Sequence, residues 1–199
     1  MIEIRWHGRG GQGAKTASLL LADAAFNTGN YIQGFPEYGP ERMGAPITAY
    51  NRISKSPIRI HSNIYKPDFV VIVDDSLIDG VNVLEGLKEN GAILINTSKD
   101  VNYIRKKLNG YNGKIYTIDA SKISRELLKA NYPNTALLAA IVNIAKIMSK
   151  EDLLKEMESA FKHKFSRKPE VIAPNMEAVK RGFDEVQGGS LWKKKEVIF

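Results

Sequence analysis

The stretch Gly8-Arg9-Gly10-Gly11-Gln12-Gly13 decides how this chain of 199 residues begins to fold. A short apolar run, residues 2–6, precedes it, and a helix-like stretch, residues 14–26, follows it. This order predicts a β-strand that ends at a turn and a helix that starts directly after it, with its first backbone N–H groups unpaired. Four glycines in six residues exceed the needs of a tight turn, the simpler interpretation. The stretch therefore predicts an anion-binding site at a helix N-terminus.

Two nucleotide-binding motifs come close to this stretch. Gly8, Gly10 and Gly13 have the G-x-G-x-x-G spacing of dinucleotide folds. The strand expected next ends at Gln33, however, without the acidic residue that holds a ribose hydroxyl. Gly8 and Gly13 also have the glycine spacing of the NTPase loop, but Lys15 comes one residue late, which turns it by about 100° around the helix. An independent nicotinamide or flavin oxidoreductase and an NTPase are both disfavoured, while Lys15 is kept as a phosphate contact.

The middle of the chain predicts an α/β fold. Continuous apolar runs, typical of parallel strands covered on both faces, alternate with helical stretches. The strands are expected at residues 68–74, 91–96 and 114–119, and the helices between them at 83–89 and 101–108. Such units form right-handed crossovers. We predict one domain over residues 1–199, a Rossmann-like three-layer α/β/α sandwich with a mostly parallel, mixed sheet and C-terminal helices.

The flanking regions add edge strands and helices. A short second strand is expected at residues 31–33, followed by a structured loop at 34–46, which is too rich in Gly and Pro for a helix or a central strand. Residues 47–53 and 58–61 then predict a hairpin at a sheet edge. Further helices are expected at 122–130, 136–148, 153–161 and 174–186, with Ser149 as the N-cap of the third.

Composition limits the chemistry of the chain. Without cysteine it can supply neither a disulfide framework nor thiolate ligands for an iron–sulfur cluster or a zinc finger. The net charge of +7 comes from lysines spread along the chain, and the one dense basic run, residues 193–195, lacks the interleaved aromatics of a nucleic-acid groove. No leader or membrane-spanning apolar run is recognisable. We therefore expect a soluble, cytoplasmic protein that binds neither nucleic acid nor a membrane.

No arrangement of residues suggests catalysis or metal binding. His7, His61 and His163 are scattered, without the ligand spacing that a zinc site requires. Asp74 and Asp75 follow a predicted strand and are expected to cap its end and form a turn rather than act as a catalytic pair. We predict no catalytic residue and no metal site on this chain.

The Gly- and Pro-rich loop at residues 34–46 is the second informative place. Its Pro and Gly residues fix the backbone, so Glu41 and Arg42 would lose little conformational entropy on binding a partner. Contact with a ligand or another subunit is favoured over a rigid crossover with a local ion pair.

Two motifs carry a family resemblance. Trp6-His7-Gly8-Arg9-Gly10-Gly11-Gln12-Gly13 and Phe35-Pro36-Glu37-Tyr38-Gly39-Pro40-Glu41-Arg42-Met43-Gly44-Ala45-Pro46 closely resemble the gamma subunits of pyruvate:ferredoxin oxidoreductases. Within the wider 2-oxoacid:ferredoxin oxidoreductase family, they look more like the pyruvate members than the 2-oxoglutarate or indolepyruvate members. The likeness covers nearly the whole chain, through Arg52-Ile53-Ser54, Pro67-Asp68, Asn96-Thr97, Pro133-Asn134-Thr135, Asn175 and Gly182.

The resemblance implies a role in a complex. The family's reaction is the oxidative decarboxylation of a 2-oxoacid with coenzyme A, which yields acyl-CoA and carbon dioxide and passes electrons to ferredoxin. Thiamine diphosphate and iron–sulfur clusters are implied on the partner alpha, beta and delta subunits, and none on this chain. Ferredoxin would be reached through the complex, and the isolated chain is expected to be inactive.

For this chain the resemblance implies a contribution to coenzyme A binding and to assembly. The pyrophosphate of coenzyme A suits a glycine-lined helix N-terminus. The residues expected to contact this substrate are Gly8, Arg9, Gly10, Gly11, Gln12, Gly13, Lys15, Tyr38, Glu41 and Arg42. An assembly subunit without a ligand site, or a gamma subunit for another 2-oxoacid, is the alternative.

Overall fold

The computed structural model describes residues 1–37 and 43–189, so three expected ligand contacts, Tyr38, Glu41 and Arg42, lie outside the described residues. The described part forms one sheet with the strand order β2-β3-β1-β4-β5-β6-β7. The strands are β1 (Ile2–Arg9), β2 (Tyr31–Pro36), β3 (Pro46–Ser54), β4 (Phe69–Ile72), β5 (Ala92–Asn96), β6 (Lys114–Ile118) and β7 (Gln187–Gly188). Strands β1, β4, β5 and β6 run parallel to one another, while β3, β2 and β7 pair antiparallel with their neighbours. The sheet is therefore mixed, as predicted.

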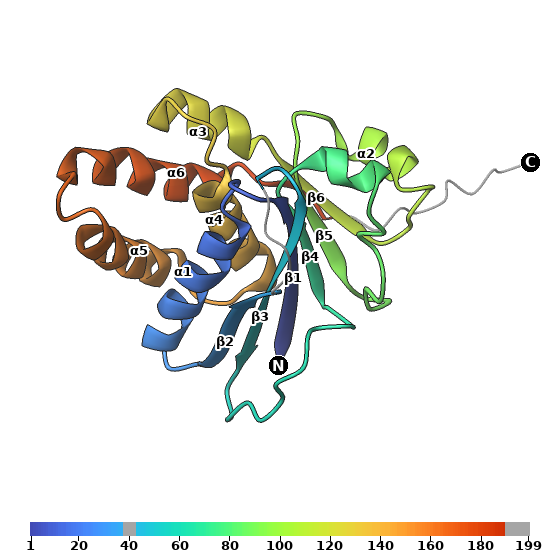
Figure 1. The fold of residues 1–199 in the computed structure, drawn as a ribbon, viewed down its shortest axis with the longest axis horizontal. Helices are drawn as coiled ribbons and strands as arrows, with labels where there is room; N and C mark the ends of the chain where they lie inside the picture. Colours follow the sequence, from blue (N-terminus) through green and yellow to red (C-terminus); the bar gives the residue numbers. More distant parts are fainter. Residues whose placement is uncertain (38–42, 190–199) are drawn as a thin grey trace, which may run out of the picture.

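Helices cover both faces of this sheet, which confirms the predicted three-layer α/β/α sandwich (Figure 1). The helices are α1 (Ala14–Asn27), α2 (Val101–Lys107), α3 (Ala120–Leu128), α4 (Asn134–Ala145), α5 (Lys150–Lys164) and α6 (Ile172–Asp184), with short 3-10 turns η1 (Asp75–Asp79) and η2 (Pro169–Val171). One layer contains α1 and α3 to α6, and α2 packs on the opposite face. Helix α4 is buried on all sides at residues 136–142, which explains why its sequence is apolar all round.

The hairpin at the sheet edge differs from the prediction. Residues 47–53 pair with β2, from Tyr31 opposite Ser54 to Pro36 opposite Ala49, and residues 58–61 form no strand. The predicted loop therefore starts later, since residues 34–36 belong to β2. Proline is tolerated there because β2 is the edge strand of the sheet and has one side without ladder bonds.

The helix predicted at residues 83–89 is also absent, and a chain of turns takes its place. Gly86 has a left-handed φ of 65° and packs directly on the backbone carbonyl of Tyr65, where no side chain fits. Glycine suits this conformation and this close approach, which together interrupt the helix. The other predicted helices are confirmed, and the Ser149 side chain accepts a hydrogen bond from Asp152 N as the expected N-cap of α5.

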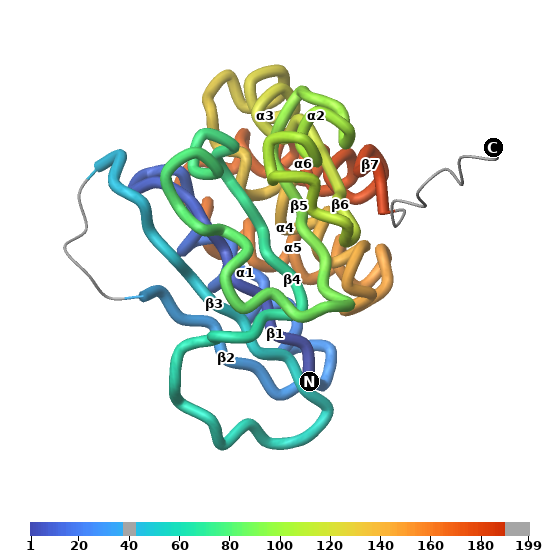
Figure 2. The backbone as a smooth tube through the Cα atoms, turned by 90° about the vertical axis from the view of Figure 1, so that its right-hand side faces the viewer, coloured from blue at the N-terminus to red at the C-terminus, as the bar shows by residue number. Residues whose placement is uncertain are grey.

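A long connection between β3 and β4, residues 55–68, extends beyond the ends of the strands near β2 (Figure 2). It is attached by side chains of the hairpin: Gln33 Nε2 donates to the Ile60 carbonyl at 2.9 Å, and Arg52 Nη2 donates to the Asn63 carbonyl at 3.2 Å. Residues 58–61, predicted as the second strand of a hairpin with residues 47–53, therefore belong to an irregular segment that accepts a hydrogen bond from Gln33.

Candidate functional site

The glycine turn joins β1 to α1 and is held against the start of β3. Gly10 N donates to the Ala45 carbonyl at 2.9 Å, and Gly44 N donates to the Gly10 carbonyl at 3.1 Å. Gly11 and Gly13 have left-handed φ angles of 91° and 86°, which glycine adopts without steric cost. These bonds and angles set the main chain so that α1 starts at the carboxyl edge of the parallel strands.

Close packing adds a second reason for glycine. A Cβ atom on Gly13 would lie 2.8 Å from Asn134 Cγ at the start of α4, and one on Gly8 would lie 3.0 Å from Ala14 Cβ. A Cβ atom on Gly11 would meet only the tip of the Met43 side chain, at 2.9 Å. Gly8 and Gly13 therefore serve the packing of strand and helices, whereas Gly11 lies at the open side of the turn.

The first turn of α1 has no cap within the part of the chain that the structure describes. Gly13 occupies the N-cap position and has no side chain that could accept a hydrogen bond from the helix. The N–H groups of residues 14–16 have no hydrogen-bond acceptor among the described residues. A cavity of about 350 Å³, here called the cradle cavity, opens in front of these groups. Its lining is Gly10, Gly11, Gly13, Lys15, Thr16, Met43 and Ile47. Free N–H groups, the helix dipole and the exposed Lys15 make this cavity favourable for an anion.

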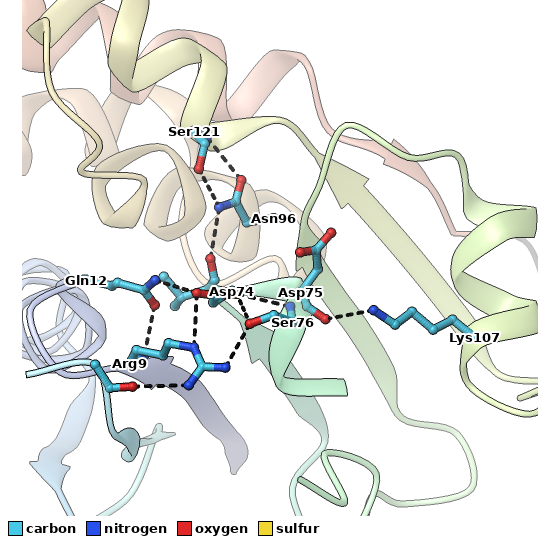
Figure 3. Close-up of polar contacts among 10 residues, drawn as sticks. Arg9, Gln12, Asp74, Asp75, Ser76, Asn96, Lys107 and Ser121 are labelled. Carbon is cyan, nitrogen blue, oxygen red and sulfur yellow. Dashed lines mark hydrogen bonds and ion pairs between the residues drawn. The ribbon is translucent and has the colours of Figure 1, made fainter. Parts of the chain in front are cut away.

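Arg9 and Gln12 attach the turn to the end of β4 (Figure 3). Arg9 Nη1 donates to the Gly44 carbonyl at 3.1 Å and Nη2 to Ser76 Oγ at 2.9 Å, while Nε lies 3.4 Å from Asp74 Oδ2. Gln12 Oε1 accepts from Arg9 N at 2.8 Å, and Gln12 Nε2 donates to Asp74 Oδ2 at 2.6 Å. Both side chains are thus engaged within the chain, and their role at the turn is to hold its shape.

Asp74 is ionised and structural. Burial acts to raise its pKa, but hydrogen bonds from Ser76 and Gln12, together with the charge of Arg9, lower that pKa below its ordinary value. Its carboxylate also caps η1 by accepting from Ser76 N at 3.0 Å. Asp75 Oδ2 accepts from Thr97 Oγ1 at 2.8 Å. The prediction that these two acids cap a strand end and form a turn is confirmed.

Asn96 closes the polar network on the far side of Asp74 (Figure 3). Its Nδ2 donates to the Val73 carbonyl and to Ser121 Oγ, both at 2.9 Å, and its Oδ1 accepts from Ser121 N at 3.1 Å. Among residues 1–37 and 43–189, no group of three or more His, Asp or Glu side chains is placed to hold a metal ion. The carboxyl edge of the sheet therefore carries a network of satisfied hydrogen bonds.

His7 precedes the turn and is buried within β1. The side chain is 7% exposed, and its Nε2 accepts a hydrogen bond from Arg5 Nε at 3.0 Å. Burial, with a further contribution from the charge of Arg5, lowers the pKa of His7 to about 4. The imidazole is therefore neutral at pH 7 and has a structural role, as the hydrogen-bond partner of Arg5.

Sequence reasoning missed three neighbours of the turn: Asp74 as the partner of Arg9, Met43 at the open side, and Asn134 against Gly13. Asn134 belongs to a motif that the sequence does single out, but its distance of 121 positions along the chain hides the contact.

Among the described helices, none combines the length and the apolar character needed to cross a bilayer.

Comparison with known proteins extends these observations. The model of the pyruvate ferredoxin/flavodoxin oxidoreductase family matches residues 3–185. The chain is 48% identical over 186 residues to pyruvate synthase subunit PorC of Thermotoga maritima, covering 94% of this chain and 95% of that protein. It is 43% identical over 187 residues to the pyruvate/ketoisovalerate oxidoreductases common subunit gamma of Pyrococcus abyssi, covering 94% and 98%. The crystal structure of the Thermotoga maritima subunit matches with a TM-score of 0.82 at 43% identity, over 95% of this chain and 98% of that one.

Proposed function

This chain belongs to the pyruvate ferredoxin/flavodoxin oxidoreductase family and is a subunit of a pyruvate oxidoreductase, and from this premise we propose that it supplies a phosphate site for coenzyme A. The enzyme would convert pyruvate and coenzyme A to acetyl-CoA and carbon dioxide, passing two electrons to ferredoxin. In this proposal the chain acts as the gamma subunit, and the cradle cavity binds the pyrophosphate.

One observation carries the proposal. The N–H groups of residues 14–16 lack acceptors within the described part of the chain, and they face a cavity lined by glycine and by Lys15. A pyrophosphate would accept from these groups and would lie at the positive end of the α1 dipole. Arg9 and Gln12 would act indirectly, by holding the turn open through Asp74.

The chemistry of the reacting carbon would come from other subunits. Thiamine diphosphate, when bound there, would stabilise the carbanion formed on decarboxylation. Iron–sulfur clusters need thiolate ligands, which this chain does not contain. The task of this chain is to bind and orient coenzyme A and to contact the alpha, beta and delta subunits. The Pyrococcus abyssi relative is named as common to a pyruvate and a ketoisovalerate enzyme, which fits a gamma subunit that does not choose the 2-oxoacid.

The proposal is tested by titrating coenzyme A into the assembled oxidoreductase by calorimetry, with wild-type chain and with Gly11→Asp. The new carboxylate would repel the pyrophosphate, but it would also displace the tip of Met43 and strain the main chain at φ 91°, so circular dichroism first has to show a preserved fold. We expect affinity to fall by at least about tenfold, since like charges in contact cost several kcal/mol. Gly29→Asp is the matched control, because Gly29 also has a left-handed φ, 77°, and a Cβ atom there has no neighbour within 4 Å. Unchanged affinity in Gly11→Asp would overturn the cradle assignment.

A second candidate function is that the turn is a subunit contact without a ligand. Met43, 86% exposed beside the turn, favours this candidate, since large exposed apolar side chains often lie in interfaces. In that case Gly11→Asp would weaken the association of the subunits in size-exclusion chromatography and leave coenzyme A affinity per assembled complex unchanged.

A further inference from the structure

The connection between β3 and β4 carries a concentration of positive charge. Residues 55–67, here called the basic arm, contain two lysines and one arginine and no acidic residue. Lys55, Arg59 and Lys66 are all exposed, and none of them forms an ion pair with the residues that the structure describes. Such a segment favours contact with a negatively charged partner.

The positive charge is unbalanced mainly in the first half of the arm. Near its other end, Lys88 N donates to the Pro67 carbonyl at 3.1 Å, and Gly86 packs on the Tyr65 carbonyl. The turn that makes these contacts also carries two exposed acids, Glu85 and Glu89, which offset the charge of Lys66. Lys55 and Arg59 are therefore the cations on which a contact would depend.

The basic arm lies at the opposite end of the sheet from the glycine turn. It leaves β3 after Ser54, beside the start of β1 at Ile2, and enters β4 at Phe69, which is paired with Ile4. The glycine turn instead follows the other end of β1, at Arg9. The arm extends beyond the strand ends, so a partner can reach it without approaching the cradle cavity (Figure 2).

The arm has no regular secondary structure, yet its backbone is attached at several points. The Ile60 carbonyl accepts from Gln33 at 2.9 Å and the Asn63 carbonyl accepts from Arg52 at 3.2 Å, while Ile64 is buried. Ordered loops of this length without helix or strand are uncommon and are often functional. Because the backbone is already held, the arm would lose little conformational entropy on binding.

Large apolar side chains are exposed beside these cations. Tyr65 is 70% exposed and Ile60 is 45% exposed, both within the arm. Tyr31, 49% exposed, stands opposite Ser54, the residue directly before the arm. Tyrosine and arginine are enriched at the centres of protein interfaces, and a group of exposed apolar side chains marks such a surface. Charge and apolar area thus occur on one projecting segment.

We propose that the basic arm docks an acidic segment of another subunit of the oxidoreductase. Arg59 and Lys55 would bind its carboxylates, and an apolar side chain of the same segment would cover Ile60 and Tyr65. A second copy of this chain fits less well, because a two-fold contact would bring the cations of the arm against each other. Nucleic acid also fits less well, since two unbalanced cations are few for a phosphate backbone.

The test measures association of this chain with the remaining subunits of the oxidoreductase, at about 0.05 M and about 0.5 M salt. The double variant Lys55→Glu, Arg59→Glu should bind at least about tenfold more weakly at low salt, and the difference from wild type should shrink at high salt. Tyr65→Ala should bind at least about tenfold more weakly at both salt concentrations, because loss of an apolar contact is not screened. Circular dichroism checks that each variant is folded.

Matched controls change the same residue types elsewhere on the surface. The double variant Lys106→Glu, Lys155→Glu makes the same change in net charge on α2 and α5, and Tyr103→Ala removes a tyrosine of α2 that is 50% exposed. Both controls should associate like wild type.

Several results would overturn the inference. Wild-type affinity and salt dependence in the arm variants would do so, as would equal weakening in the controls. If the chain alone forms dimers, or binds double-stranded DNA, through Tyr65 and Arg59 while assembly is unchanged, the partner is another one and the proposal is wrong. Coenzyme A affinity of the assembled complex should stay unchanged in the arm variants, so the arm and the cradle cavity succeed or fail separately.

Discussion

The burial of His7 predicts a pH-dependent stability that can be calculated. In the folded chain its pKa is lowered to about 4, first by burial and then by the charge of Arg5. In the unfolded chain an imidazole has a pKa of about 6.5. Between these two values the unfolded chain binds a proton that the folded chain does not bind. The free energy of unfolding therefore falls as the pH is lowered through this range, and for this group it is constant above and below it.

The size of the effect follows from the same two pKa values. Lowering the pH from 7.5 to 5 should remove about 2 kcal/mol of unfolding free energy through His7 alone. Continuing to pH 4 and below should bring the loss to about 3 kcal/mol. In His7→Gln this contribution should disappear, because the amide oxygen of glutamine can still accept from Arg5 but does not titrate.

The assay is urea unfolding of the wild-type chain and of His7→Gln at pH 7.5 and 5, followed by circular dichroism. The difference between the two pH values should be about 2 kcal/mol larger for wild type than for the variant. Histidine ring resonances in an NMR titration give an independent readout, with the exposed His61 and His163 in the same spectrum. Equal pH dependence in both proteins, or a His7 ring that titrates near pH 6.5, would refute the reasoning.

Three further substitutions test the packing around the turn and the helices. Gly13→Ala would place a Cβ atom 2.8 Å from Asn134 Cγ on a residue with a φ of 86°. In urea titration this variant should lower the unfolding free energy by about 1–3 kcal/mol. Gly80→Ala has open space around its Cβ atom and should change the unfolding free energy by less than about 1 kcal/mol. Gly182→Ala places a Cβ atom against the backbone of α4. The melting temperature should fall, corresponding to a loss of about 1–3 kcal/mol in unfolding free energy. A variant as stable as wild type would contradict the close contact of α4 and α6. Ser149→Ala removes the N-cap of α5 and should cost about 1 kcal/mol, while Ser149→Asp, which can still accept the bond, should retain most of the stability.

The strand, glycine turn and first helix were predictable because each depends on local chemistry. Alternation of side chains sets the faces of β1, and glycine is required where φ is positive, at Gly11 and Gly13. The apolar runs of β4, β5 and β6 indicate burial on both faces, and Ser149 indicates the start of a helix. Signals of this kind act within a few residues, so they can be read along the chain.

The partner of each strand and the surroundings of the turn were decided only by tertiary structure. Pairing of residues 47–53 with β2 rather than with 58–61 depends on which segment reaches the sheet edge, and the missing helix at 83–89 depends on the approach of Tyr65 to Gly86. The glycine motif by itself predicted a turn and a helix N-terminus, and α1 does start at Ala14, directly after it. The contact between Gly13 and Asn134 arose from packing between helices that are distant in sequence, and such contacts leave no local pattern.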